Sequence, residues 1–483
     1  MYALCTFFVL LHQKSDSIHD MKTAFLIAAA SSGSGKTTLT IGLLRALHNK
    51  GYKVQPFKCG PDYIDPLYHR IACERDSVNL DTWMQPEQDV QQAFHRYSQN
   101  ADICIVEGVM GLYDGAEGIR GSSAEVAELL GIPVVLVINA RSMAHSIAPI
   151  LKGYLTYRPA TQIAGVIFNN VGSQRHEQML RRAAEEVGMP VIGAIPRMME
   201  LYSPSRHLGL DISETERINQ LAEKVAEIIH NSQFTIATSF SRSARDPFGV
   251  HNSQLDNNCQ LSTVKAAIER EENQTCLSSS EREQARTKFN CQLSTDSKLS
   301  TLNYKLSEIY IARDAAFNFL YRQTIDYLRE WGEVHFFSPL ANETVPQDAD
   351  LVFLPGGYPE FFLPQLSESH ATMKSLRQTR ARIWAECGGM MYLSEGIDDT
   401  DMTGLLPFRT TMQDAHLHLG YRSMMVNGKE LRGHEFHYSN IMGTPPPSDI
   451  QLLDAQGQPV DTGFYIHDNI YAGYTHWLYP LIP

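Results

Sequence analysis

Short apolar runs alternate with amphipathic segments over residues 21–231. The runs AFLIAAA, DICIVEG, PVVLVINA and IAGVIFNN have the length of strands and are apolar throughout. Strands that are buried on both faces of a parallel sheet show this pattern. The segments between them, such as TLTIGLLRALHNKG and AEVAELLG, have helical periodicity and end at a glycine typical of a helix C-cap. The alternation predicts a doubly wound α/β domain around a parallel sheet.

A second region of the same kind spans residues 306–483. Its apolar runs EIYIARD, EVHFFSP, DLVFLPGG and ARIWAECGG again alternate with helical stretches. The later part is richer in strand-like segments such as SMMVNG and GFYIHD. We therefore predict a second α/β domain here.

Two segments fit neither domain. In residues 232–305 polar side chains dominate and NCQLST occurs twice, which indicates a mostly disordered linker with a transient helix around VKAAIEREEN. A small regulatory insert is the alternative. Residues 1–20 contain one largely apolar stretch of only ten residues, YALCTFFVLL, and no basic n-region. We interpret them as an N-terminal extension, or as the result of a translation start assigned upstream of the true start at Met21. A weak signal sequence is the alternative.

Composition limits the class of partner. Of the 483 residues, 41 are basic and 54 acidic, giving a formal net charge of −13, and no basic stripe appears. This argues against nucleic acid as the main partner. The eight cysteines include no Cys-x-x-Cys pair, so we expect reduced thiols, a cytoplasmic location and no membrane association. A homodimer is left open.

The stretch ASSGSGKT, between FLIAA and TLTIGLLRAL, has the context of a P-loop: strand, glycine-rich turn, then a lysine at a helix N-terminus. Oriented backbone amides and a cation together bind a triphosphate. The ATP-binding residues that we predict are Gly33, Ser34, Gly35, Lys36, Thr37 and Thr38. Lys36 would contact the β- and γ-phosphates and Thr37 would bind Mg²⁺. Ala30 replaces the usual first glycine.

A magnesium ion on phosphates needs a carboxylate at the end of a nearby buried strand. Glu107, which closes DICIVEG, is the first candidate. Asp62 in KCGPDYIDP is the second, with a turn or capping role as the alternative for both. Asn169, at the end of IAGVIFNN, either reads the adenine edge or caps the next loop.

The stretch AECGGM places Cys387 between an apolar strand and two glycines, where a sharp turn would present the sulfur. The amide of Gly388 would then face an oxyanion, and Gly356 and Gly357 of LPGGYPE could complete the hole. A thiol nucleophile needs a base, and His476 in YAGYTHWLY is the favoured one. The pairs His434/His437 and His416/His418 lack the spacing of a zinc-binding helix, so we predict no zinc.

Together these residues resemble the cobyrinate a,c-diamide synthase family over residues 21–231 and 306–477. The shared motifs are FKCGPDYIDPLYH, VEGVMGLYDG, ARDAAFNF, LPGGYPE, ECGGMMYL and GHEFHYS. The resemblance implies a dethiobiotin synthetase-like domain that activates a carboxylate with ATP and Mg²⁺, as an acyl phosphate. It also implies a class I glutamine amidotransferase-like domain that releases ammonia from L-glutamine. The substrate would be a tetrapyrrole carboxylate of the cobalamin pathway.

By the same resemblance, Lys36, Thr37 and Glu107 hold nucleotide and metal. The residues implied near the γ-phosphate or the tetrapyrrole are Asp62, Tyr63, Asp65, Tyr113 and Asp114. Because the substrate is a polyanion, cations such as Lys58, Arg141 or Arg206 should line its cleft. One departure concerns the usual amidotransferase triad, whose acid lies two residues after the histidine: here that residue is Leu478. A backbone carbonyl or a distant acid, with Glu435 as one guess, must orient the ring instead.

Two alternatives stay open. The same chemistry could act on hydrogenobyrinate or nickel-sirohydrochlorin, because motifs for ATP and glutamine do not depend on the metal of the macrocycle. The chain could instead be a partitioning-type P-loop ATPase switch. Such proteins carry an extra lysine early in the loop, where this chain has Ser31 and Ser32.

Overall fold

The computed structural model describes residues 23–197, 212–231, 306–426 and 428–479, and the statements below concern these ranges. The predicted N-terminal extension, the polar segment 232–305 with VKAAIEREEN, and Arg206 lie outside them. The two α/β regions are described separately.

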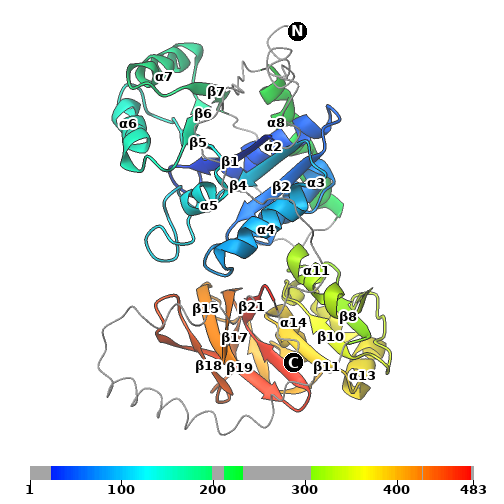
Figure 1. Ribbon diagram of the computed structural model, residues 1–483. Helices are drawn as coiled ribbons and strands as arrows, with labels where there is room; N and C mark the ends of the chain where they lie inside the picture. Colours follow the sequence, from blue (N-terminus) through cyan, green and yellow to red (C-terminus); the bar gives the residue numbers. More distant parts are fainter. Residues whose placement is uncertain (1–22, 198–211, 232–305, 427, 480–483) are drawn as a thin grey trace, which may run out of the picture. The chain divides into compact units, whose positions relative to one another are not determined.

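The N-terminal region contains a seven-stranded parallel sheet in the order β3-β2-β4-β1-β5-β6-β7 (Figure 1). The order reverses direction on either side of β1, as in a doubly wound fold. The strands are β1 (Thr23–Ala29), β2 (Val54–Cys59), β3 (Val78–Leu80), β4 (Ile103–Glu107), β5 (Val134–Asn139), β6 (Ile163–Val171) and β7 (Val191–Pro196).

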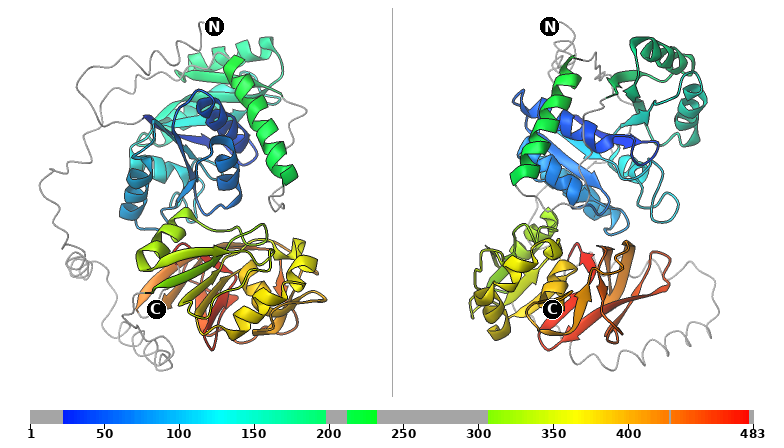
Figure 2. Two further views of the ribbon diagram at one scale, coloured as in Figure 1. Left: turned by 90° about the vertical axis from the view of Figure 1, so that its right-hand side faces the viewer. Right: turned by 180° about the vertical axis from the view of Figure 1, so that it is seen from behind.

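Helices cover both faces of this sheet. On one face α2, α3 and α8 contact one another, and Figure 2 shows α8, in green, beside α2. Gly42 of α2 permits this approach, because a Cβ there would lie 2.1 Å from Val225 Cγ1. The helices are α2 (Lys36–His48), α3 (Ile64–Cys73), α4 (Glu87–Ser98), α5 (Ser123–Leu130), α6 (Ile147–Tyr157), α7 (Gln174–Glu186) and α8 (Ile212–Asn231).

The central strand β1 shows why its sequence is apolar at every position. Phe25, Ile27 and Ala29 pack into the core under α2 and α8, whereas Leu26 and Ala28 pack into the core on the opposite face. Successive side chains of a strand point to opposite faces, so a strand covered on both sides needs apolar residues throughout.

The C-terminal region contains a ten-stranded mixed sheet in the order β21-β16-β15-β18-β19-β20-β11-β10-β8-β9. From β9 to β20 neighbouring strands are parallel, and from β20 to β21 they are antiparallel. The strands are β8 (Glu308–Ala312), β9 (Glu333–Phe337), β10 (Leu351–Leu354), β11 (Arg382–Glu386), β15 (His418–Val426), β16 (Lys429–His437), β18 (Ile450–Leu453), β19 (Pro459–His467), β20 (Ile470–Gly473) and β21 (Thr475–Trp477).

A second, four-stranded sheet and short helices complete this region. The sheet has the order β13-β12-β14-β17. Its strands are β12 (Ser394–Ile397), β13 (Thr400–Asp401), β14 (Leu406–Thr411) and β17 (Asn440–Ile441). The helices are α11 (Arg322–Trp331), η3 (Pro359–Phe361), α12 (Leu363–Ser367), α13 (His370–Gln378) and α14 (Gly388–Leu393). All six residues of α14 are buried, so this helix is fixed in the core directly after Cys387.

The predicted fold class is confirmed: a doubly wound parallel sheet is followed by a second α/β unit whose later part is rich in strands. Among the helices of the described ranges, none is both long and apolar enough to cross a membrane.

Candidate active sites

The predicted P-loop lies between the end of β1 and the start of α2 at Lys36. Gly33 and Gly35 have φ angles of 75° and 96°, a left-handed conformation that glycine adopts without strain. Asn169 supports the turn, since its side-chain amide donates to the Ser34 carbonyl at 2.9 Å. A Cβ on Gly35 would lie 2.2 Å from Asn169 Nδ2, so only glycine fits there. Asn169 thus contacts the loop itself, and its role toward adenine stays a prediction.

Thr37 and Glu107 meet at the start of α2. The Thr37 hydroxyl donates to Glu107 Oε1 at 2.6 Å and to Asp65 Oδ2 at 3.3 Å. Glu107 is completely buried, and its other oxygen lies 2.7 Å from His69 Nε2. Lys58 Nζ lies 2.5 Å from Asp65 Oδ2 and 3.2 Å from Glu107 Oε1. Side chains from β2, α3, β4 and α2 therefore form one charged network.

The groups in this network determine one another's protonation states. Burial alone would raise the pKa of Glu107, but Lys58 and His69 outweigh it and hold the pKa well below its ordinary value. Burial alone would lower the pKa of Lys58, but the carboxylates of Asp65, Glu107 and Asp62 raise it above its ordinary value. Glu107 is therefore an anion and Lys58 a cation across the physiological pH range.

The donors in this network fit a magnesium ion. A hydroxyl from Thr37 and carboxylates from Glu107 and Asp65 converge at the helix N-terminus, and Mg²⁺ prefers such hard oxygen ligands. The predicted ligand Asp62 is used differently: its Oδ1 accepts from the amides of Ile64 and Asp65 at 2.9 and 3.1 Å, which is the capping alternative. Asp65, which we predicted near phosphate or substrate, lies closer to Thr37.

The sequence did not reveal Lys58 and His69 as parts of this network. Both left a signal: Lys58 is a charged residue in a strand that is buried at all six positions, and His69 follows Asp65 by four residues, on the same face of α3. We expected Lys58 to line a substrate cleft. That expectation is wrong, since Lys58 is 3% exposed and paired with carboxylates. Arg141 is exposed, so it stays a candidate.

Three other predicted residues lie at the P-loop or in the loop after β4, and a fourth precedes α3. Lys36 Nζ donates to the Met110 carbonyl in the loop after β4. Asp114 in the same loop accepts from the Gly111 amide at 2.9 Å. Tyr113 stacks on Tyr154 of α6, with ring centroids 5.8 Å apart. Tyr63 is a buried residue that precedes α3. Their roles toward phosphate or tetrapyrrole stay predictions.

Cys387 occupies the predicted elbow between β11 and α14. Its backbone has φ 45° and ψ −108°, a strained conformation for a residue with a side chain. The side chain is 3% exposed, and burial raises the pKa of the thiol well above its usual range. The sulfur lies 3.8 Å from the Phe436 carbonyl oxygen. Resting Cys387 is therefore a neutral thiol that needs a base.

Three glycines surround the elbow. A Cβ on Gly388 would lie 3.1 Å from the Gly357 nitrogen, so the two predicted oxyanion-hole residues are neighbours in space. A Cβ on Gly356 would lie 3.2 Å from Cys387 Cβ and 2.1 Å from His476 Cε1. Gly356 thus separates the thiol from the imidazole with no side chain between them. The structure brings Cys387, Gly357, Gly388 and His476 together.

His476 is the central residue of β21 and is completely buried. Burial and the neighbouring His434 and His437 lower the pKa of its imidazole to about 3. Neither ring nitrogen makes a hydrogen bond of standard geometry with a described residue. A neutral imidazole whose nitrogens lack a well-formed hydrogen bond is suited to accept a proton from the thiol.

Two buried carboxyl groups are present near this site. Glu386 Oε2 lies 3.8 Å from His476 Nδ1, and burial raises the pKa of Glu386 to about 8. Glu435, our guess for orienting His476, is wrong for that role because it pairs with Arg422 and accepts from His437 and Thr462. These partners outweigh the effect of burial and lower the pKa of Glu435 to about 2.

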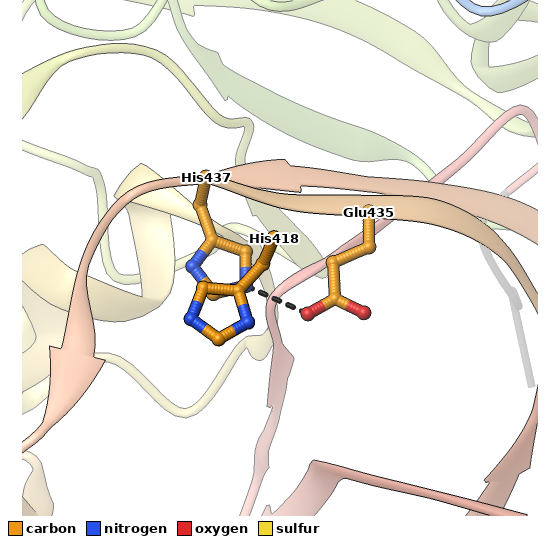
Figure 3. A group of neighbouring side chains, drawn as sticks. All are labelled: His418, Glu435 and His437. Atoms are coloured by element: carbon orange, nitrogen blue, oxygen red, sulfur yellow. Dashed lines mark hydrogen bonds and ion pairs between the residues drawn. The ribbon is translucent and has the colours of Figure 1, made fainter. Parts of the chain in front are cut away.

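Figure 3 shows Glu435 with His437 and His418, whose potential ligand atoms lie within 4.8 Å of one another. Each group also has a protein partner: His437 Nδ1 faces the Ser439 carbonyl, His418 Nε2 faces Asn440 Oδ1, and Glu435 pairs with Arg422. A guanidinium on the carboxylate opposes a metal cation at the same oxygens. The absence of zinc stays a prediction.

Comparisons with known proteins assign each region to a family. Residues 25–210 match the CobQ/CobB/MinD/ParA nucleotide binding domain, and residues 308–480 match the CobB/CobQ-like glutamine amidotransferase domain. A hydrogenobyrinate a,c-diamide synthase of Brucella anthropi is 39% identical over 86% of this chain and 89% of its own length. Cobyrinate a,c-diamide synthases of Priestia megaterium and Caldanaerobacter subterraneus are 37% and 35% identical. Each alignment covers 94% of this chain and, respectively, 93% and 95% of the relative.

Proposed function

This chain belongs to the cobyrinate/hydrogenobyrinate a,c-diamide synthase family, and on that premise we propose that it amidates the a and c carboxylates of cobyrinate in cobalamin biosynthesis. ATP and L-glutamine are the co-substrates. The nucleotide-binding and glutamine amidotransferase domains support this pairing of substrates. The reaction would take place in the cytoplasm.

The N-terminal region would activate the carboxylate. The P-loop amides and Lys36 bind the triphosphate, and the carboxylate oxygen attacks the γ-phosphorus to give an acyl phosphate and ADP. A magnesium ion held by Thr37, Glu107 and Asp65 would neutralise phosphate charge. A carboxylate resists attack by ammonia because oxide is a poor leaving group, and phosphorylation removes that obstacle.

The C-terminal region would supply the ammonia. His476 takes the thiol proton of Cys387, the sulfur attacks the carboxamide carbon of glutamine, and the amides of Gly357 and Gly388 stabilise the oxyanion. The imidazolium then protonates the leaving nitrogen, so ammonia departs and a thioester remains for hydrolysis. Ammonia displaces phosphate from the acyl phosphate to give the amide.

The observation that carries the proposal is the gap left by Gly356. A thiol at a strained elbow, two amides of an oxyanion hole and a neutral imidazole come within reach of one another only because this position has no side chain. A partitioning-type ATPase switch has no use for this arrangement, and the match of residues 308–480 to a glutamine amidotransferase domain favours amidation over it.

The test is amidation of cobyrinic acid with ATP and Mg²⁺, comparing glutamine with an ammonium salt as the nitrogen source. We expect Cys387→Ala to lose glutamine use and to keep ammonia use, whereas Lys36→Ala loses both. Cys73→Ala, which removes another buried free thiol, is the matched control and should keep both. Loss of both activities in a folded Cys387→Ala protein would contradict separate sites.

The same assay distinguishes the tetrapyrroles. Hydrogenobyrinic acid and nickel-sirohydrochlorin are offered in parallel with cobyrinic acid, and we expect the highest kcat/KM for cobyrinic acid. A higher value for either competitor would replace the substrate in the proposal and leave the chemistry unchanged.

A further inference from the structure

We propose that Glu386, the residue immediately before the nucleophile, is the carboxylate that orients His476. The inference rests on the proposed glutaminase function and assigns a positioning residue to it. In the usual triad the acid follows the histidine by two residues, and here that residue is the apolar Leu478. The orienting group therefore has to come from another part of the fold, either a carboxylate or a backbone carbonyl such as that of Phe436, which raises the pKa of His476. A carbonyl carries no net charge, so loss of activity on removing the Glu386 charge distinguishes the two.

The sheet brings Glu386 to the imidazole. Glu386 is the last residue of β11 and is 2% exposed, and β11 contacts β21, which carries His476. Glu386 Oε2 lies 3.8 Å from His476 Nδ1. Catalytic hydrogen bonds are often long before substrate binds and shorten in the complex, so this separation suits a resting enzyme.

The carboxyl group is itself held in place. Its Oε1 accepts from the Trp384 indole at 3.0 Å and from the Trp477 amide at 3.2 Å. Both tryptophans are among the largest fully buried side chains of the described residues. Because Oε1 is anchored on both sides, Oε2 is the oxygen that faces the imidazole.

The geometry gives Glu386 a definite task. With Nδ1–H directed to Glu386, the other nitrogen, Nε2, is left to exchange a proton with Cys387. When His476 takes the thiol proton, an imidazolium forms on a completely buried side chain. A carboxylate beside Nδ1 stabilises that charge and keeps the ring from rotating. The competent form has an ionised Glu386, a neutral His476 and a protonated Cys387. Because burial raises the pKa of Glu386 to about 8, the share of this form grows as pH rises toward that value.

The rival carboxylate is excluded by its contacts. Glu435 is completely buried, but it pairs with Arg422 and accepts hydrogen bonds from His437 and Thr462. Its oxygens are already occupied by these partners, so although its charge also raises the pKa of His476, it does not hold the ring in place.

The test compares Glu386→Gln with wild type in glutamine-dependent and ammonia-dependent amidation of cobyrinic acid. The glutamine side chain keeps an oxygen for the Trp384 and Trp477 donors, so the fold should be retained, but it removes the negative charge. We expect kcat with glutamine to fall at least about 100-fold, with an unchanged KM for glutamine and unchanged ammonia use. Glu386→Asp, which restores the charge on a shorter side chain, should recover part of the loss.

Two controls separate positioning from structure. Glu435→Gln should lower the melting temperature and keep the ratio of glutamine-dependent to ammonia-dependent rates. Trp384→Phe removes one anchor but no charge and should reduce kcat less than Glu386→Gln does. Wild-type kcat in Glu386→Gln, or an equal loss in Trp384→Phe, would overturn the role of Glu386. A wild type that cannot use glutamine at all would instead refute the proposed function.

Discussion

The two candidate sites differ in whether their buried polar groups have charged or hydrogen-bonding partners. At the nucleotide end, Lys58, Asp65, Glu107 and His69 are charged or hydrogen-bonded to one another. At the thiol end, Cys387 is a neutral thiol and both nitrogens of His476 lack standard hydrogen bonds. A buried polar group without a partner costs free energy, typically about 1–3 kcal/mol. In the first site the buried polar groups therefore satisfy one another. In the second site the thiol and the imidazole should gain hydrogen-bond partners only when the amide substrate binds and a proton is transferred.

The two sites also use glycine for different purposes. The P-loop uses glycines with left-handed φ angles so that amides can point at phosphate. The elbow uses glycines mainly to remove side chains between reacting groups. The two sites should therefore respond differently to the same kind of substitution.

The largest effect is expected from Gly356→Ala. The new methyl group would lie 2.1 Å from His476 Cε1, so the imidazole must move away from the thiol. We expect glutamine-dependent amidation to fall about 1,000-fold or more, with ammonia-dependent amidation retained. Steady-state rates with both nitrogen sources measure this.

Gly153→Ala is the matched control, because a Cβ at this helical position meets nothing within 4 Å. It should leave both activities unchanged and slightly raise the melting temperature. Normal glutamine use by Gly356→Ala would show that the gap between thiol and imidazole is not needed.

A smaller effect is expected at the nucleotide end from Thr37→Val, which keeps the shape and removes the hydroxyl that contacts Glu107 and Asp65. We expect kcat/KM for ATP to fall about 100-fold with either nitrogen source, since activation precedes amide formation. Thr40→Val on the same helix is the control: the Thr40 hydroxyl is buried without a hydrogen-bond partner, so its loss should be neutral or stabilising. Selective loss of glutamine use in Thr37→Val would contradict the division of labour between the two regions.

The smallest effect concerns stability as a function of pH. Burial raises the pKa of Glu386 from 4.5 to about 8. Between these values the folded protein holds a proton that the unfolded chain has lost, so this group makes the protein less stable as pH rises from about 4.5 to 8. Glu386→Gln has no such titration. Its melting temperature minus that of wild type should therefore be more positive at pH 8 than at pH 5, by a few degrees.

Scanning calorimetry at the two pH values measures this difference, with Glu435→Gln as the opposite case. The lowered pKa of Glu435 stabilises the fold above about pH 4.5, so that variant should be less stable than wild type at both pH values. A pH-independent difference for Glu386→Gln would show that Glu386 ionises normally in the folded protein.

Local sequence was enough to predict the P-loop and the cysteine elbow, because each is a strand, a turn and a helix that follow one another directly. The identity of the partners was harder to predict. Glu107 was predicted as a magnesium ligand because it ends an apolar strand. Its contacts with Lys58 and His69, however, depend on how β2, α3 and β4 pack together. The spacing of apolar and polar residues along the sequence does not predict which of these elements lie next to one another.

Glu386 and Glu435 illustrate the same limit at the other site. Both are glutamates in strands beside glycine-rich or histidine-rich motifs, and from the sequence we named Glu435 as one guess without considering Glu386. We propose Glu386 instead because Glu435 pairs with Arg422, whereas Glu386 at the end of β11 lies 3.8 Å from His476. Strand order alone would bring Glu435 to His476, because β16 pairs with β21 and β11 does not. Glu386 comes close to His476 because β11 pairs with β20, and the chain continues from β20 directly into β21.

Because β21 pairs with β16, the polypeptide could be split into two fragments that each carry part of the proposed glutaminase site. Cys387 follows β11 in the parallel half of the ten-stranded sheet, and His476 lies on an edge strand that pairs with β16 in the antiparallel half. A polypeptide split in the exposed turn around residues 455–457 would leave the proposed nucleophile on one fragment and the proposed base on the other. Neither fragment alone could hydrolyse glutamine, but their reassociation through β18–β19, β11–β20 and β16–β21 pairing would restore the activity, so that regained turnover would report the assembly of the sheet.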